Sequence, residues 1–394
     1  MEQLPVITTM PHFLLLLYPL ATSAVWEMSK CMKNHMKTNH IREQEQNLGD
    51  DDMEPKFTIS TVLDETIGNC VPAPTVPAIY SAECKTLTSE DAFASEKSFL
   101  VDFNNGRLGN QLSSFASVFA LAKLTGLRVM LTHSCQTILS TYFSNLPFPV
   151  LEQTYCHPCT QFNFHPLGED TAPILHGQAY RLAAAYSNMI PQFAQHLPQL
   201  RSMLAFKPEY VAAARKLLEE AAAEMGFASP TFVGLHNRRT DYKSHMMAYG
   251  EDFVGQEYFR SALKLFRKSL KNPVFLVVTD DMPWARRHIT GRDVFYSAAE
   301  AASQTSKENA GQFGAGVDLA TLASCNHTII TYGTFGLWGS LLSGGATIIS
   351  TRSVVLKGLI ERADLSQFVF VNEEQNWESF QRSVSRAIDS VTLK

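Results

Sequence analysis

The sequence predicts an α/β protein whose C-terminal part contains a doubly wound parallel sheet. Short apolar runs suited to buried strands alternate with segments of helical periodicity from about residue 98 onward. Polar and glycine-rich stretches directly follow several of these runs, as they do in open α/β sheets. The chain has 394 residues, of which 45% are hydrophobic and 18% charged, a globular composition with enough length for two domains.

The first 95 residues show no sustained helical or strand period. An apolar run of 14 residues at 13–26, FLLLLYPLATSAVW, is shorter than the roughly 20 residues that a membrane-spanning helix needs. A signal peptide, a short signal anchor and a tail with a chance apolar run are all open readings of it. Charged clusters and the proline-rich stretch at 71–80 follow. We therefore expect 1–95 to form a hydrophobic segment and a flexible stem.

An N-terminal α/β half is expected at 96–205. SFLVDF at 98–103 and RVMLTH at 128–133 have the length and apolarity of buried strands. Between them, apolar residues recur at the spacing of a helix face, from Leu112 through Phe115 to Phe119. This strand–helix–strand order indicates a parallel α/β unit. The stretch from about 135 to 200 is rich in aromatic residues and prolines, and no element is assigned there.

A C-terminal Rossmann-like half is expected at 206–394. It opens with a helix that has Pro208 in its first turn and Gly226 near its end, the usual placement of these two residues. Apolar strands and helices then alternate, which predicts the doubly wound sheet. The expected strands lie at 231–236, 274–281, 293–298, 327–332 and 346–350, and the expected helices at 256–270, 318–326 and 334–345.

A glycine-rich loop, GRLGNQ at 106–111, joins the first strand to the first helix. Its glycines allow a ligand to approach the backbone, and the N–H groups that open a helix attract anions. A purely structural turn would explain the glycines equally well. It would explain less easily the polar side chains of Arg107, Asn110 and Gln111 beside them.

The segment HNRRTDY at 236–242 directly follows an apolar strand. The planar guanidinium groups of Arg238 and Arg239 suit phosphate, and they can stabilise the charge of a diphosphate leaving group. The alternative is a surface ion pair between Arg239 and Asp241.

A third polar segment, Gly333-Thr334-Phe335-Gly336, joins a strand to a helix. Thr334 is expected to cap this helix, either as a plain structural cap or with the N–H groups turned toward a phosphate. The tripeptide Asn326-His327-Thr328 is a glycosylation sequon.

Other features of the sequence exclude or weaken several classes of function. A net charge of -5 does not favour a nucleic-acid partner. No metalloprotease, EF-hand or zinc-finger spacing occurs, and we expect no metal site. Cys156 and Cys159 form a lone CxxC pair, which fits a luminal disulfide or two buried thiols better than a zinc site.

The three polar segments together resemble the α-1,2-fucosyltransferase family. They match the order and approximate spacing of that family's motifs over about 98–350, while the HxRR-D pattern is shared with α-1,6- and protein O-fucosyltransferases. The resemblance implies a GT-B-like fold, with two Rossmann-like halves and a donor cleft between them. It also implies an inverting, metal-independent and cofactor-free transfer of L-fucose from GDP-fucose to O2 of a terminal β-galactose. The matching stretches are FNNGRLGNQ, VGLHNRRTDY and DLATLASCNHTIITYGTFGLWGSLLSGG.

The resemblance also implies roles for individual residues. Arg238 would hold the diphosphate and assist departure of GDP, and Asn110 would lie at the reacting centre. Arg239 and Asp241 would hold their loop in shape. The general base is open between Asp241, His236 and no dedicated base. The implied catalytic residues are Arg238, Asn110 and Asp241, and the implied donor-binding residues are Arg107, Gly109, His236, Arg238, Arg239, Asp318, Thr334, Phe335 and Gly336.

Three departures from the family pattern bear on the acceptor side. Asn237 stands where an apolar or small residue is usual, and neither KSHMMAYG at 243–250 nor the segment at 175–190 matches well. The alternatives are therefore a fucosyltransferase of another linkage, a protein O-fucosyltransferase, and an inactive lectin-like binder. The family resemblance further implies a Golgi membrane enzyme with a luminal catalytic domain, and the sequon predicts a glycan at Asn326. Secretion after signal cleavage is the alternative location.

Overall fold

The computed structural model describes most of the chain beyond residue 97. The hydrophobic segment and stem expected at 1–95 lie outside the described residues, as do Cys156 and Cys159. None of the helices in the described part combines the length and apolarity needed to cross a bilayer. The described ranges are 98–102, 106–150, 165–168, 173–175, 178–184, 187–243, 246, 253–297, 307–371 and 377–392.

The first sheet is parallel and has the strand order β2-β1-β4-β3. Its strands are β1 (Phe99–Val101), β2 (Arg128–Met130), β3 (His165–Leu167) and β4 (Ala179–Leu182). Helix α3 (Leu108–Thr125) connects β1 to β2, which confirms the strand–helix–strand unit predicted from the sequence. Helix α4 (His133–Tyr142), β3, β4 and the short helices α6 (Ile190–Phe193) and α7 (Leu197–Met203) occupy the stretch where no element was predicted.

The second sheet is also parallel and has the order β10-β9-β8-β5-β6-β7. The five strands expected here are confirmed as β5 (Thr231–Asn237), β6 (Pro273–Thr279), β7 (Val294–Tyr296), β8 (His327–Ile330) and β9 (Thr347–Ser350). A sixth strand, β10 (Phe368–Val371), was not predicted. The expected helices are present as α8 (Pro208–Met225), α10 (Gln256–Ser269), α12 (Lys307–Ser324) and α13 (Gly333–Ser343), together with α11 (Met282–His288), α14 (Val354–Arg362) and α15 (Trp377–Thr392).

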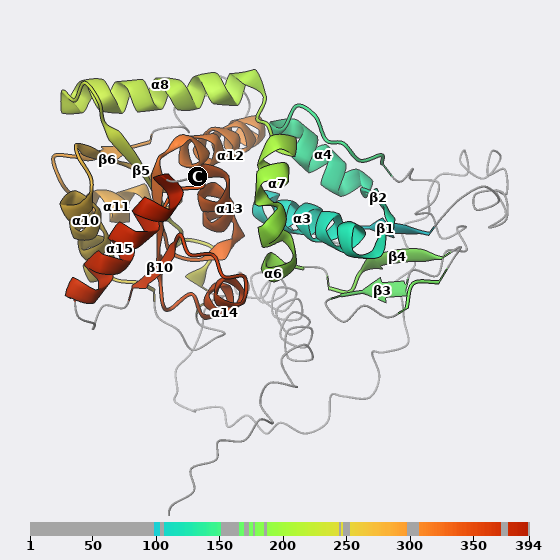
Figure 1. Cartoon of the computed structure of the whole chain (residues 1–394). Helices are drawn as coiled ribbons and strands as arrows, with labels where there is room; N and C mark the ends of the chain where they lie inside the picture. The colour runs from blue at the N-terminus through green and yellow to red at the C-terminus, as the bar shows by residue number, and fades with distance from the viewer. Residues whose placement is uncertain are drawn as a thin grey trace, which may run out of the picture. The chain divides into compact units, whose positions relative to one another are not determined.

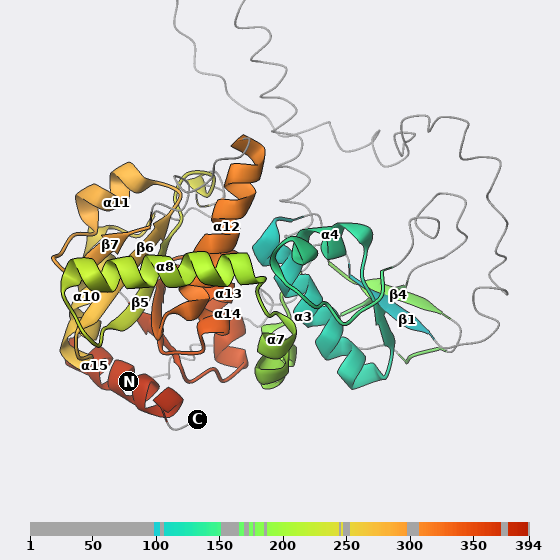
Figure 2. The same cartoon turned by 90° about the horizontal axis from the view of Figure 1, so that it is seen from above.

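Alternate residues along the central strands face opposite layers of helices. Phe275 and Val277 belong to a core with α10 and α15, whereas Val274 and Leu276 pack with Ala221 of α8 on the other face. Helices α8, α12 and α13 contact one another in succession, and α10 contacts α15 (Figures 1 and 2). Both faces of this sheet are therefore covered, which is why its strands are continuously apolar.

Helix α8 begins and ends where the sequence predicts. Pro208 is its first residue, and Gly226 ends it with a left-handed φ of 71°. At this position glycine avoids the steric penalty that a Cβ would bring.

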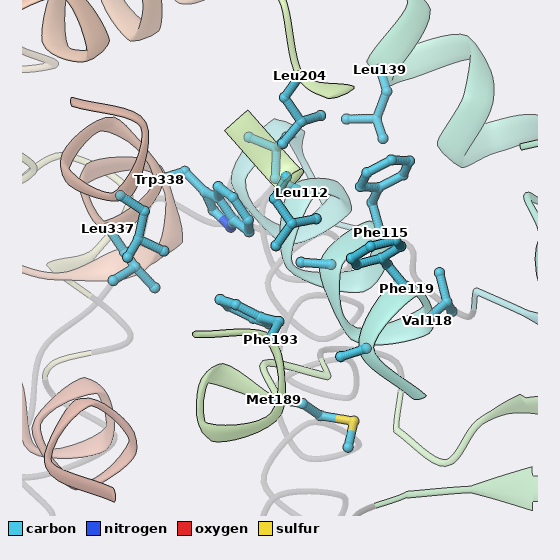
Figure 3. Close-up of a cluster of buried hydrophobic side chains, with 14 of the residues drawn as sticks. Leu112, Phe115, Val118, Phe119, Leu139, Met189, Phe193, Leu204, Leu337 and Trp338 are labelled. Atoms are coloured by element: carbon cyan, nitrogen blue, oxygen red, sulfur yellow. The ribbon is translucent and has the colours of Figure 1, made fainter. Parts of the chain in front are cut away.

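One hydrophobic cluster joins α3 of the first half to α13 of the second. Leu112 of α3 lies beside Trp338 of α13, and Phe115, Phe193 and Leu337 belong to the same cluster of buried side chains (Figure 3). The indole Nε1 of Trp338 donates to Oγ of Ser113 at 2.9 Å. This contact brings the first turns of α3 and α13 together.

Two parallel α/β sheets with covering helices confirm the predicted GT-B-like fold class. The domain boundary between 205 and 206 stays a prediction, because the cluster shared by α3 and α13 draws its residues from both sides of it.

Candidate functional site

The three polar segments singled out in the sequence meet in space. The Thr334 hydroxyl at the start of α13 donates to Oδ1 of Asn110 in α3 at 2.7 Å. Arg107 forms an ion pair with Asp241, the aspartate of the HNRRTDY segment. The carboxyl ends of β1, β5 and β8 therefore contribute to one site, as expected for open α/β sheets.

The first turn of α3 lies directly against the first turn of α13. A Cβ on Gly109 would stand 2.6 Å from the backbone nitrogen of Phe335 and 2.7 Å from Oγ1 of Thr334. Glycine is thus required at position 109 by the closeness of a second backbone. The contact brings the N-terminal turns of two helices side by side, and a helix N-terminus favours a negatively charged ligand.

The start of α13 differs from the prediction. Thr334 is not the N-cap, because the helix begins at Gly333 and Tyr332 occupies the cap position, with no capping hydrogen bond from its side chain. Gly333 has a φ of 78°, a left-handed conformation that turns the chain from β8 into the helix. The Thr334 hydroxyl is consequently available to Asn110.

Arg238 is the guanidinium at the centre of the site. Its Nε and Nη2 donate to the two oxygens of Asp241 at 3.0 and 2.8 Å, and its side chain is 19% exposed. Burial, and secondarily the positive charge of Arg107, lower the pKa of Arg238. The guanidinium carbon lies 5.0 Å from the centre of the Tyr242 ring. Its Nη1 is close to Gly333, at 3.5 Å from the position that a Cβ on this glycine would take. The alternative pair predicted from the sequence, Arg239 with Asp241, is wrong, because Asp241 pairs with Arg238 and Arg107.

Arg239 has different surroundings from its neighbour in the chain. Its guanidinium lies 3.8 Å from the ring centre of Trp284 and 4.7 Å from that of Phe253. Its Nε is 3.8 Å from a carboxylate oxygen of Asp281. The structure thus places Arg239 among residues of the loop after β6 and of α11, apart from the Arg238–Asp241 pair.

His236 is the last but one residue of β5 and is 6% exposed. Burial, and to a smaller extent the charge of Arg238, lower its pKa to about 4, so the imidazole is neutral near pH 7. The ring lies 5.3 Å from that of Phe335, and a Cβ on Gly336 would stand 2.5 Å from its Nδ1. The Nδ1 atom is buried and has no hydrogen-bond partner among the described residues. Gly336 therefore lets α13 pack tightly against this imidazole.

Two other predicted residues lie at separate positions. Asp318 is in α12 and accepts a hydrogen bond at 3.4 Å from Ser297, which follows β7. Asn326 precedes β8, at the end of that strand opposite Gly333, and its Oδ1 accepts from the Phe232 amide at 2.9 Å. The hydroxyl of Thr328, the third residue of the sequon, is buried against Thr347. Glycosylation of Asn326 stays a prediction.

Asn237, the departure from the family pattern, points away from the site. It is fully buried and donates from Nδ2 to Oγ1 of Thr279 on the neighbouring strand β6 at 3.3 Å. Its effect is therefore on the pairing of β5 with β6.

The sequence analysis gave no role to Asp280. This residue is the first of two aspartates that follow the apolar run at 274–278 and Thr279. The Asp280 carboxylate accepts hydrogen bonds from the backbone of Arg239 and from Thr240. The signal in the sequence was the position of an acidic residue directly after a buried strand.

Comparison with known proteins reveals the chain's relatives. Residues 74–355 match the model of the family described as Glycosyl transferase family 11. The chain is 31% identical over 249 residues to the mouse galactoside 2-alpha-L-fucosyltransferase Sec1, covering 62% of this chain and 64% of that protein. It is 33% identical over 251 residues to the cattle galactoside alpha-(1,2)-fucosyltransferase 1, covering 62% of this chain and 66% of that one. The chain thus spans just under two thirds of the length of these relatives.

Among solved structures, the fucosyltransferase NodZ from Bradyrhizobium is similar with a TM-score of 0.40 at 15% identity, covering 62% of this chain and 93% of that one. The family match covers more than half of the chain and includes all three segments that meet at the site. We conclude that the chain belongs to glycosyl transferase family 11.

Proposed function

We propose that the protein is an inverting α-1,2-fucosyltransferase that moves L-fucose from GDP-fucose to O2 of a terminal β-galactose. Membership of the family and the names of relatives at 31% and 33% identity support fucosyl transfer to a galactoside. One geometric observation carries the proposal: the half-buried Arg238 stands beside the paired N-termini of α3 and α13. That arrangement suits the diphosphate of a nucleotide-sugar donor.

In this proposal the galactose O2 displaces GDP from C1 of fucose in one in-line step. The C1–O bond to the β-phosphate breaks, and the bonding electrons leave with GDP. Arg238 and the N–H groups of α13 stabilise the charge that develops on the diphosphate. The step inverts the β-linkage of the donor into an α-fucoside.

The titratable groups in the described part of the site are poorly placed to accept the acceptor proton. Both carboxylate oxygens of Asp241 already accept hydrogen bonds from Arg238, and His236 is packed against Phe335 and Gly336. We infer that departure of GDP drives the reaction, that the proton of the acceptor hydroxyl passes to a phosphate oxygen of the departing GDP, and that Asn110 orients the acceptor. In this scheme Asp241 holds Arg238 in place.

A transfer assay with the full chain tests the proposal. GDP-fucose, a panel of β-galactosides and a chelator such as EDTA would be used, with the product linkage read by NMR. We expect an α-1,2-linked fucoside and no loss of rate with EDTA. Another linkage, or transfer to a protein acceptor only, would overturn the acceptor assignment. Absence of GDP binding and of transfer would overturn the whole proposal in favour of an inactive binder.

We further propose that the chain acts in the Golgi lumen, held there by its N-terminal segment. The support is the apolar run at 13–26 followed by a proline-rich stretch. Expression in animal cells of the full chain and of a chain lacking 13–26, followed by fractionation, tests this. Equal recovery of both chains in the cytosol would contradict it.

A further inference from the structure

Asp280, which has no part in the proposed chemistry, makes three hydrogen bonds to the loop that carries Arg238. Its Oδ1 accepts from the Arg239 amide at 2.7 Å. Its Oδ2 accepts from the Thr240 amide at 3.1 Å and from the Thr240 hydroxyl at 2.8 Å. A carboxylate that accepts several N–H and O–H bonds holds a short loop more firmly than neutral acceptors do.

The sheet explains why Asp280 can reach this loop. Strands β5 and β6 pair in parallel along their full lengths, with His236 opposite Val278 and Asn237 opposite Thr279. Arg238 and Asp280 are the residues that follow these pairs, where the two chains leave the sheet. Beyond Asn237 the backbone no longer pairs with β6, so the amides of Arg239 and Thr240 need other hydrogen-bond acceptors. The carboxylate of Asp280 supplies them.

The loop is held on its other side as well. The Arg238 amide lies 3.4 Å from Oγ1 of Thr331, which follows β8. The Arg239 side chain is stacked on Trp284 of α11. The backbone around Arg238 is therefore held by Thr331, which follows β8, and by Asp280, which follows β6. From this backbone the Arg238 side chain extends toward Gly333 and Asp241.

Asp280 also counterbalances positive charge in the site. Burial and the charge of Arg107 lower the pKa of Arg238, and the carboxylate of Asp280 acts in the opposite direction. The same carboxylate opposes the lowering of the pKa of His236.

We propose that Asp280 is a positioning residue: it fixes the turn of residues 238–240 so that the Arg238 guanidinium faces the donor diphosphate, without contacting the donor itself. The inference rests on the proposed function in one respect, namely that Arg238 binds the diphosphate of GDP.

The test compares Asp280→Asn with wild type in the full chain. The substitution keeps the shape of the side chain but replaces one acceptor oxygen with an N–H donor. Affinities for GDP and for GMP are measured by calorimetry, and kcat and KM by the transfer assay. Because GMP lacks the second phosphate, displacement of Arg238 is expected to weaken GDP binding by about tenfold while GMP binding changes much less.

The matched control is Asp293→Asn. Asp293 pairs with Arg267 at 2.6 Å near the start of β7, and it loses a charge in the same way at a distance from the site. We expect GDP and GMP affinities close to those of wild type. We also expect Asp280→Asn to raise the KM for GDP-fucose while leaving the KM for the galactoside unchanged. General destabilisation does not produce this split, because loss of folded enzyme lowers the apparent kcat without changing either KM.

Thr240→Val provides a second, milder variant that removes only the hydroxyl bond to Asp280. It is expected to weaken GDP binding in the same selective manner, but less, and it carries the test if Asp280→Asn does not fold. Equal weakening of GDP and GMP, or unchanged GDP binding in folded Asp280→Asn protein, overturns the positioning role alone. Absence of GDP binding by the wild-type protein overturns the proposed function together with it.

Discussion

Arg238 and Arg239 are neighbours in the chain with different surroundings. Arg238 is paired in bidentate fashion with Asp241 beside the start of α13, whereas Arg239 is stacked on Trp284. Asp241 holds the Arg238 guanidinium through Nε and Nη2, and Nη1 lies beside Gly333 at the start of α13, where a helix N-terminus favours an anionic ligand. The aromatic and acidic neighbours of the second make it a support for the loop.

The first prediction at the residue scale concerns Arg238. Arg238→Ala is expected to lower kcat on the order of 100- to 1000-fold, because it removes a group that stabilises the leaving diphosphate. The control is Arg260→Ala, which removes an exposed arginine paired with Glu257 on α10. Initial rates with GDP-fucose measure both variants. Near-normal turnover of Arg238→Ala would contradict the assigned role.

Gly109 provides the second prediction. Gly109→Ala places a methyl group against the backbone of Phe335, so we expect a loss of about 1 to 3 kcal/mol in unfolding free energy and reduced activity. Gly358→Ala in α14 is the control, since a Cβ there comes within 4 Å of no described atom outside its own stretch of helix. It is expected to stabilise the protein by about 0.5 to 1 kcal/mol. Urea unfolding of both variants checks the contrast, and equal effects would argue against the close contact.

At the scale of elements, the second sheet depends on buried polar residues as well as on apolar strands. His327 opens β8, is 7% exposed and accepts a hydrogen bond from the Ala346 amide at 3.1 Å. Burial lowers its pKa from 6.5 to about 4. The imidazole therefore stays neutral in the folded chain over a pH range in which the unfolded chain takes up a proton.

This difference predicts a pH dependence of stability. Since the unfolded state binds more protons between pH 6.5 and about 4, the unfolding free energy falls as the pH falls through that window. His327 contributes at most about 1.4 kcal/mol per pH unit, and the buried His236 acts in the same direction. His327→Gln is expected to flatten the slope by up to half. Urea unfolding at several pH values measures it, and an unchanged slope would exclude His327 as a source.

At the scale of the whole molecule, the site exists because helices from the two halves share one core. Trp338 is fully buried among α3 and α6 residues, stacks on Phe193 at 5.6 Å and donates to Ser113 (Figure 3). The apolar part of this contact dominates its energy, since burial of a large aromatic side chain outweighs a single hydrogen bond.

The fourth prediction follows from this shared core. Trp338→Ala is expected to lower the unfolding free energy by about 3 to 5 kcal/mol, and Trp338→Phe by about 1 to 2 kcal/mol. The control is Leu124→Ala, since Leu124 is 59% exposed on α3. Calorimetry should show one shifted transition in the Trp338 variants. A separate early transition of one half would show that the halves unfold independently.

Much of the fold was predictable because its signals are local. Apolar runs of strand length and the Pro208–Gly226 pair mark elements whatever they pack against. The strands β3 and β4 have three and four residues, and β10 has the single apolar run FVFV, so each is too short to show a period. Helix α15 follows β10 and was missed along with it.

The site was predictable in part for the same reason. The sequence by itself determined which polar residues follow the strands of a parallel sheet, and parallel strands bring their carboxyl ends to one edge. Only the tertiary structure decided that Asp241 pairs with Arg238, that Thr334 bonds Asn110 and that Asp280 anchors the loop. These contacts join residues of different loops, and their geometry depends on the packing of α3 against α13 and on the register of β5 with β6, which no local pattern contains.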